Sequence, residues 1–422
     1  MLRHLNRASG RAGLIALALT AGAPFLLAPS AFAWPTSSAD VTLDDFTVKV
    51  NDGGVMVVKH AEFTNTNLSH DEIVKLLTPG TPEADDRALV EKLKADKISI
   101  PSIEITAKDG GKVHFRDFSA SDVDAGKIGK LEFGGMEASG TDKDGPVSVK
   151  SGAIRLEGLD LADALKAVGA PTDAAQKGRL SGLTWESVDI VAPDTQSGPG
   201  KTIHVAFAAL ELRGDYAGDA LKQGSTKLTG LIVEPSPDSE FGKNLAELGY
   251  SKLELAMAIG ADYHADAKTL SLDELTVDGA KMGSVGLKAN FGDIDPGLFG
   301  SDNDARMAAL FGSSISSLEI KVVNSGLFEK ALALVGKQQG ATPDALKQQW
   351  SAMAGQMMPI LLGGDPSALK VAAEAQKFIA SPKNLTISIK AKDGAIKASD
   401  FMAISDPAAF VSKLDIAAAA NQ

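Results

Sequence analysis

The chain has 422 residues, of which 54 are acidic and 42 basic, and its formal net charge is −12 with the histidines neutral. This acidic balance argues against binding to nucleic acid or to an anionic membrane surface by bulk electrostatics, because both require a basic face. The sequence contains no cysteine, which excludes disulfides, thiolate metal sites and thiol catalysis. Apolar residues make up 44% but aromatic residues only 5%, so we expect cores built from Leu, Ile, Val and Ala.

Residues 1–33 are typical of an export signal. A basic start, an apolar stretch and a small-x-small cleavage site follow one another in the order Arg3 to Arg11, 12–27 and Ala31-Phe32-Ala33. The alternative is an uncleaved membrane anchor, but Gly22 and Pro24 interrupt the apolar stretch. We therefore expect an exported, periplasmic protein with no stable membrane span after cleavage.

The mature chain is expected to open with a hairpin and two short helices. Apolar residues alternate over 41–58 around the turn Asn51-Asp52-Gly53-Gly54, which predicts the hairpin. A helix over 69–76 can be capped by Ser69 or His70, and a second helix over 81–96 begins at a Thr-Pro-Glu start signal.

Strands are expected again over 97–156, where apolar residues return to a spacing of two. Pro101 interrupts the first of these strands and belongs at an edge or a bulge, because proline cannot donate to a sheet ladder. A short helix over 161–168 closes the series. Further strands are predicted over 183–191, 202–212 and 226–233, followed by a helix over 241–248.

The clearest pattern covers residues 252–291 and predicts three neighbouring amphipathic strands. Turns are expected at 264–268 and at Asp278-Gly279. The alternation slips by one residue between Leu272 and Leu275, which indicates a bulge.

A helical insertion is expected over 326–380. Its helices are predicted at 327–335, at 343–358 with stop signals at Pro359 and Gly363-Gly364, and from the cap Asp365-Pro366 to 380. The middle helix is also a candidate to pack against small residues on the strand before it, Ala256, Ala258 and Gly260.

Trp350, Met353 and Met357 lie on one apolar stripe of that middle helix. Methionine-rich faces adapt to varied apolar partners, so these three residues are the candidate ligand-binding residues. The alternative is that the stripe packs into the core.

The pattern also suggests an internal duplication. Two sets of strand residues match at a constant offset of 157: Val113, Phe115, Phe118 and Ala120 with Leu270, Leu272, Leu275 and Val277. The helix ends Val168-Gly169 and Val335-Gly336 match as well. Chance similarity is the alternative, because amphipathic strand patterns are generic. We expect a first β-rich half over 34–240 and a second over 241–422.

Three Leu-x-Gly-Leu steps occur in the strand regions: Leu156-Glu157-Gly158-Leu159, Leu180-Ser181-Gly182-Leu183 and Leu228-Thr229-Gly230-Leu231. Together with the Asp-Gly turns and the export signal, they resemble bacterial envelope proteins of the AsmA-like kind and related uncharacterised periplasmic families. The resemblance covers most of residues 41–323. It implies a long, twisted antiparallel sheet that could shield apolar chains, although this chain lacks the retained membrane anchor of that family.

Candidate catalytic and metal-binding residues each have a simpler explanation. Ser367-Ala368-Leu369-Lys370 has the Ser-x-x-Lys spacing of penicillin-binding enzymes, but the companion motifs are missing and a serine in a first helical turn is ordinary. The histidines lack the close pairing of a zinc site. An acidic loop, Asp293, Asp295, Asp302 and Asp304, could attract calcium, although its spacing is not that of a calcium loop and Asp302 can cap a helix.

The sequence thus predicts an α+β fold: a largely antiparallel, twisted β-sheet of meanders with short capping helices and a helical C-terminal portion. We expect a non-catalytic envelope protein, without cofactor, metal or catalytic residues, that binds a lipid-like or apolar ligand on a curved sheet or binds an envelope protein. The first alternative is a structural or adapter protein without a groove. The second is an envelope hydrolase whose nucleophile and base come from distant positions.

Overall fold

The computed structural model describes residues 38–50, 53–78, 83–160, 180–194, 197–198, 200–217, 220–299, 302–361, 363–402 and 407–422. The expected export signal and the expected helix over 161–168 lie outside these residues. Two compact units divide the chain between Arg213 and Gly214, whereas the sequence pattern placed a boundary at 240. We call them unit 1 and unit 2 and describe each by itself.

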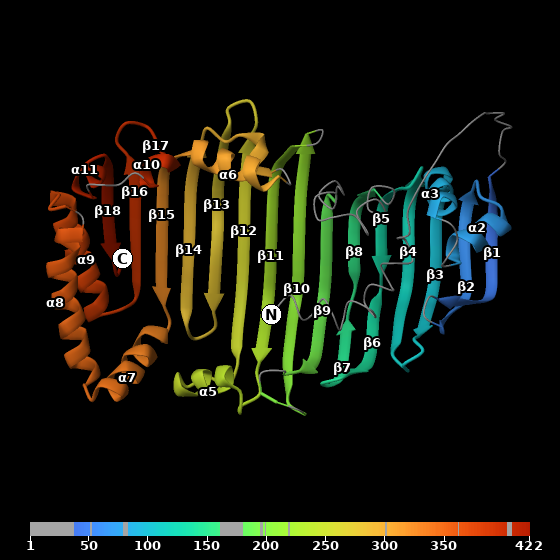
Figure 1. The fold of residues 1–422 in the computed structure, drawn as a ribbon, viewed down its shortest axis with the longest axis horizontal. Coiled ribbons are helices and arrows are strands. Elements are labelled where there is room, and N and C mark those ends of the chain that lie inside the picture. Colours follow the sequence, from blue (N-terminus) through green and yellow to red (C-terminus); the bar gives the residue numbers. More distant parts are fainter. Residues whose placement is uncertain are drawn as a thin grey trace. The chain divides into compact units, whose positions relative to one another are not determined.

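Unit 1 is an antiparallel meander (Figure 1). Its strands are β1 (Ala39–Val50), β2 (Gly54–Thr66), β3 (Lys94–Thr106), β4 (Lys112–Asp124), β5 (Lys127–Phe133), β6 (Gly135–Asp142), β7 (Gly145–Ser151), β8 (Ile154–Asp160), β9 (Gly182–Pro193) and β10 (Thr202–Ala217), the last of which runs across the division between the units. Its helices are α2 (His70–Leu77) and α3 (Glu83–Lys92).

Two long strands of the sheet are each interrupted near the centre: β5 and β6 are the two parts of one, and β8 and β7 are the two parts of the other. β5 and β6 both pair with β4 in one continuous register, in which Glu132 faces Ser119 and Ser139 faces Lys112. β7 and β8 likewise continue one another along β5 and β6. The meander therefore keeps its order through residues 127–160.

Aspartates in the left-handed conformation lie opposite glycines within this sheet. Asp117 has φ 50° and Asp122 has φ 55°. A Cβ added to Gly134 would lie 2.9 Å from the Cβ of Asp117, and one added to Gly129 would lie 2.8 Å from that of Asp122. Glycine is therefore needed at both positions, because a larger residue would collide with the aspartate side chain.

Helices α2 and α3 pack on the first strands of unit 1. Ser69 caps α2 in a capping box with Glu72: the Ser69 N–H donates to the Glu72 carboxylate at 2.8 Å, and the Glu72 N–H donates to the Ser69 hydroxyl at 3.3 Å. Ile73 of α2 is fully buried in a core with Phe63 and Ile98. Ser69, rather than His70, is thus the cap.

Pro101 lies inside the sheet and not at its edge, because β3 pairs with β2 on one side and with β4 on the other. Both ladders skip Pro101, and across it Asp117 adopts its left-handed conformation. The register is the same on both sides of Pro101 in both ladders, so this residue lies neither at an edge nor at a bulge, and the prediction is wrong.

Unit 2 is a second meander, in the order β11-β12-β13-β14-β15-β16-β18. Its strands are β11 (Ala220–Glu234), β12 (Leu253–His264), β13 (Thr269–Gly279), β14 (Gly283–Gly292), β15 (Ser314–Asn324), β16 (Asn384–Ala391), the short β17 (Ile396–Lys397) and β18 (Leu414–Ala420). Its helices are α5 (Glu240–Glu247), the 3-10 helix η4 (Pro296–Phe299), α6 (Asn303–Gly312), α7 (Leu327–Gln339), α8 (Pro343–Leu361), α9 (Pro366–Ala380), α10 (Ala398–Met402) and α11 (Pro407–Val411).

The three strands expected over 252–291 are confirmed as β12, β13 and β14, with turns at the expected places. The bulge is confirmed too, because the pairing of β13 with β14 shifts by one residue between Leu272 and Leu275. The α+β architecture of antiparallel meanders with capping helices is therefore the one that the sequence predicts.

The helical insertion α7–α9 separates β15 from β16 in the chain, yet these two strands are paired. Helix α8 runs through Pro359 and ends at Leu361, between the two expected stop signals, Pro359 and Gly363-Gly364. It packs on α7 and α9, so the expected packing on Ala256, Ala258 and Gly260 is replaced by contacts between helices. Glu374 of α9 accepts the Ala420 N–H of β18 at 2.8 Å.

The two regions matched in the sequence occupy similar places in their meanders. β4 lies between β3 and the β5–β6 strand, as β13 lies between β12 and β14. Since the helix end at Val168-Gly169 lies outside the described residues, the internal duplication stays a prediction.

Candidate apolar binding face

One face of unit 2 is built from aliphatic side chains in register across five strands. Period-2 alternation places them on the same side, and pairing aligns them into rows. The central row is Ile259, Leu275, Leu287, Ile320 and Ile387, and the next row is Met257, Val277, Val285, Val322 and Leu385. We call these two rows the apolar face.

The centre of the apolar face is exposed. Val285 keeps 51% of its surface accessible, Ile259 39% and Val277 36%. A sheet normally buries its apolar face against a second layer, so three exposed aliphatic side chains beside half-buried neighbours in these rows are unusual for a folded domain.

The opposite face of the same strands is polar. The Ser271 hydroxyl donates to the Asn290 side-chain oxygen at 3.0 Å, and the Asn290 amide donates to the Ser317 hydroxyl at 2.8 Å. This ladder crosses β13, β14 and β15. The sheet therefore has one face suited to water and one suited to an apolar partner.

η4 and α6 lie at one end of the apolar face. The ring of Tyr263, a buried residue of β12, contacts Phe299 of η4 with a centroid distance of 4.9 Å. Asp302 caps α6, whose Ala309 is buried, while Met307, Leu310 and Phe311 are exposed. This end thus carries an apolar rim.

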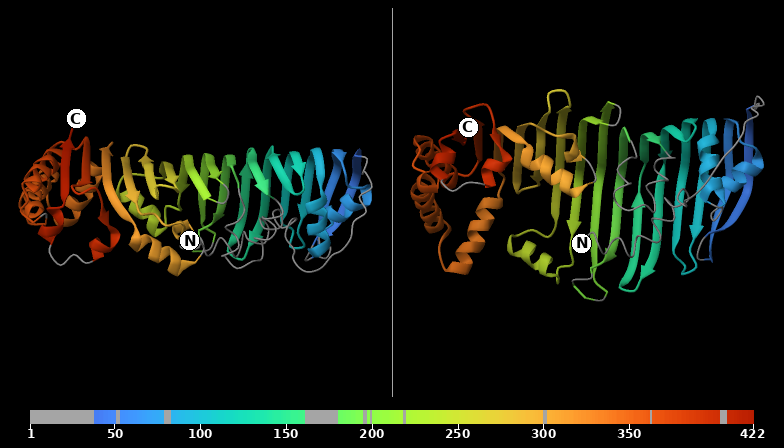
Figure 2. Two further views of the ribbon diagram at one scale, coloured as in Figure 1. Left: turned by 90° about the horizontal axis from the view of Figure 1, so that it is seen from above. Right: turned by 45° about the horizontal axis from the view of Figure 1, so that its top comes forward.

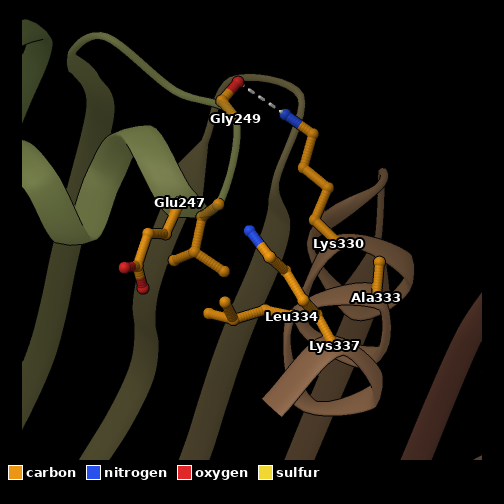
Figure 3. Close-up of a pocket in the computed structure, with 7 residues that line it drawn as sticks. Glu247, Gly249, Lys330, Ala333, Leu334 and Lys337 are labelled. Atoms are coloured by element: carbon orange, nitrogen blue, oxygen red, sulfur yellow. Dashed lines mark hydrogen bonds between the residues drawn. The ribbon is translucent and has the colours of Figure 1, made fainter. Parts of the chain in front are cut away.

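The other end holds a pocket between α5 and α7 with a volume of about 330 Å³ (Figure 3). The Lys330 ammonium of α7 donates to the Gly249 carbonyl at 3.1 Å and lies 3.4 Å from the centroid of the Tyr250 ring. Leu248 and Leu334 supply apolar lining, and Lys337 reaches in from the same helix. The pocket is therefore apolar with a basic side.

A carboxyl pair lies on the polar face. Burial and a hydrogen bond with the carboxyl group of Asp262 raise the pKa of Asp273, so Asp273 holds a proton more readily than an isolated aspartate does. Asp273 lies in the β-bulge of β13. Paired carboxylates are an element of acid–base sites, but Asp273 is exposed on the polar face, and neither aspartate lines the pocket.

The three residues predicted to bind a ligand are separated by the structure. Trp350 packs edge-to-face on Phe328 at a centroid distance of 6.0 Å, and Phe328 also contacts Phe378 at 5.7 Å. Met353 and Met357 are 46% and 48% exposed on α8. Trp350 is thus part of the contact between α7, α8 and α9, while the methionines remain available to a partner.

The other candidate residues have local roles. The Ser367 hydroxyl donates to Asp365 at 2.6 Å, and these serine hydrogen bonds lower the pKa of the Asp365 cap. Asp295 and Asp302 accept backbone N–H groups of their own turns. Among the described residues, no cluster of three or more potential metal ligands forms.

The histidines His60, His114 and His204 pair across strands with Asp44, Ser102 and Asp189. Such pairs are ordinary on a polar sheet face. Within the described ranges, no helix has both the length and the hydropathy to cross a bilayer.

Lys330 and Lys337 were not singled out from the sequence. A signal was present, because residues seven apart on a helix share a face, with Leu334 between them. Their pocket also needs Gly249, which lies 81 residues away from Lys330 in the chain. Only the fold brings these residues together.

Comparison with known proteins gives one match. A family model described as "Uncharacterized protein" matches residues 276–421, which lie within unit 2 and include most of the apolar face. No curated protein matches the chain.

Proposed function

We propose that this chain is an exported, non-catalytic envelope protein that binds a lipid-like, apolar ligand on the apolar face of unit 2. The exposed rows through Ile259, Val277 and Val285 are the single observation that carries the proposal. The export signal expected at residues 1–33 supports the periplasmic location. The AsmA-like resemblance of the strand repeats agrees with a role in shielding apolar chains.

The energetics suit an acyl chain. Burial of about ten methylene groups stabilises a complex by roughly 8 kcal/mol, from which the cost of association must be subtracted. A single chain on an open face should therefore bind with micromolar to millimolar affinity. Such an affinity permits both capture and release.

The test compares two cross-strand pairs on opposite faces of one hairpin. The double substitution V277Q/V285Q places amides on the apolar face, whereas D278Q/S284Q changes the neighbouring pair on the polar face. Both pairs should tolerate polar side chains. Val277 and Val285 are already exposed, and Asp278 and Ser284 are already polar. We expect the first variant to weaken binding of a fluorescent long-chain fatty acid about tenfold, and the second to change it less than about twofold.

Equal weakening by both variants, with unchanged circular dichroism, would show that the fatty acid binds elsewhere. Native mass spectrometry of protein purified without detergent gives an independent check. Lipid adducts are expected in the wild type and fewer in V277Q/V285Q. A wild-type spectrum without adducts would count against the proposal.

A second candidate is an adapter role, favoured by a stripe on α8. Met353, Met357 and Ile360 lie at helical spacing on one face of α8, and all three are exposed. A stripe of this kind suits a protein partner. I360E should abolish cross-links to envelope proteins in intact cells under this role, and should leave fatty acid binding unchanged.

A further inference from the structure

The α5–α7 pocket lies at the hairpin end of the apolar face. The Tyr250 hydroxyl, just after α5, donates to the Lys281 carbonyl at 3.0 Å, and the Leu327 N–H at the start of α7 donates to the Met282 carbonyl at 3.2 Å. Both helices are therefore anchored on the β13–β14 turn. The pair Val277–Val285 lies two residues from the last pair of this hairpin, roughly 7 Å along the strands.

The pocket is on the same side of the sheet as the apolar face. Figure 2 shows α5, α6 and α7 on one side of the strands of unit 2. η4, which contacts α6, packs Phe299 onto Tyr263, and Tyr263 follows Met257, Ile259 and Ala261 on the apolar side of β12. A chain lying parallel to the strands, across both rows, would thus reach the pocket with one end.

The basic side of the pocket is suited to an anion. An ammonium group has three N–H donors, and Lys330 uses one of them on Gly249. Among the described residues, none pairs with Lys337, which lines the pocket together with Leu248 and extends into it from α7 (Figure 3). Glu247 also lines the pocket, but Figure 3 shows its carboxylate directed away from Lys337. Two ammonium groups on one helix face therefore share one small volume.

This basic side contrasts with the overall charge. The chain carries 54 acidic and 42 basic residues, so an unpaired lysine beside an apolar pocket is not the result of an excess of lysine. An ammonium group next to apolar side chains gains from an anionic oxygen more than it would in open water, because the local dielectric is lower.

We propose that the α5–α7 pocket binds the anionic head group, phosphate or carboxylate, of the amphiphile whose chain lies on the apolar face. This inference rests on the proposed lipid-binding function and adds the orientation of the ligand. The head group lies at the hairpin end and the chain extends toward η4. Lys337 makes the direct contact. Lys330, held by Gly249 and Tyr250, supplies a fixed second charge.

The experiment uses the full mature protein and three amphiphiles with the same chain, each below its critical micelle concentration. Titration calorimetry compares dodecyl phosphate, dodecyl maltoside and dodecyltrimethylammonium. Inorganic phosphate alone is the fourth probe. We expect dodecyl phosphate to bind about five- to tenfold more tightly than dodecyl maltoside, and the preference to shrink as salt is raised.

Variants at an exposed lysine separate recognition from folding. K337Q should reduce the preference, because only the Lys330 charge remains, and K337E should remove it, because the new carboxylate offsets that charge. K370Q, which removes an exposed lysine from α9, is the matched control and should leave the preference unchanged. Lys337 is also exposed, so all three variants should keep the wild-type melting temperature.

The possible results separate the two proposals. Equal affinity for all three amphiphiles, unaffected by K337Q, would overturn the head-group site and leave lipid binding intact. Binding of none of them would overturn both. Inorganic phosphate that binds as tightly as dodecyl phosphate, and depends on Lys337, would show a site for free phosphate and would also overturn the inference.

Discussion

At the scale of single residues, unit 2 contains two neighbouring carboxyl groups whose proximity is unfavourable when both are charged. Asp273 and Asp262 form a carboxyl pair, and the pKa of Asp273 is raised by burial and by this neighbour. A carboxyl whose pKa is higher in the folded state than in the unfolded state binds protons preferentially when folded. Stability therefore falls as pH rises from the unfolded pKa through the raised folded pKa, and the penalty then persists at neutral pH.

D273N should remove that penalty. The expected gain in the free energy of unfolding at pH 7 is a few tenths of a kcal/mol, because the pair is exposed and screened. Below the unfolded pKa the gain should vanish, since the Asp273 carboxyl is then protonated in both the folded and the unfolded state. Urea unfolding at pH 7 and pH 3 measures both values. A gain of the same size at the two pH values would mean that the carboxyl pair is not its cause.

At the scale of elements, α9 protects the outer strand of unit 2. An edge strand exposes unpaired N–H groups that can recruit another chain. Here Glu374 of α9 accepts the Ala420 N–H, and hydrogen bonds from Lys377 and then from Ala420 lower the pKa of Glu374. Because its folded pKa is lowered, this contact stabilises the structure above the unfolded pKa and is lost as pH falls through the folded pKa.

E374L should therefore loosen the end of β18 at neutral pH. Amide exchange of residues 418–421 should be faster in the variant than in the wild type. The two proteins should converge as pH falls through the lowered folded pKa of Glu374, because the wild-type carboxylate is then protonated. As a control, the exchange of β13 should be the same in both proteins. Unchanged exchange of β18 at pH 7 would show that packing alone protects the edge.

The elements also show which features the sequence could predict. Alternation of apolar residues is a local property, so β12, β13 and β14 and the bulge after Leu272 were predictable. The end of α8 was predictable as well, because the helix passes Pro359 but ends at Leu361, just before the expected stop at Gly363-Gly364. Packing of Trp350 was one of the two alternatives for the stripe, but its partner Phe328 could not be identified from the sequence, because the two rings meet only in the folded structure.

At the scale of the whole molecule, strand patterns predict which face is apolar but not whether another layer covers it. In unit 1, helices α2 and α3 cover the first strands, and Ile73 of α2 is buried in the core there. In unit 2, by contrast, Val285 remains exposed. Nothing in the alternation of the two regions distinguishes these outcomes, because each depends on where helices distant in the chain come to rest. The sequence therefore predicts that an apolar sheet face exists, but it does not predict which strands carry the part of that face that stays exposed.

Ligand binding should consequently protect one unit more than the other. A ligand that binds only the folded state at about 100 times its Kd stabilises it by about 2.7 kcal/mol, which slows exchange through unit-wide opening about a hundredfold. With dodecyl phosphate, we expect that slowing in β12–β15 and little change in β2–β4. Hydrogen exchange with mass spectrometry measures both regions in one sample, and V277Q/V285Q is the control that should lose the difference. Protection spread equally over both regions would place the ligand outside the apolar face, because a site confined to unit 2 has no means of slowing the opening of β2–β4 to the same extent.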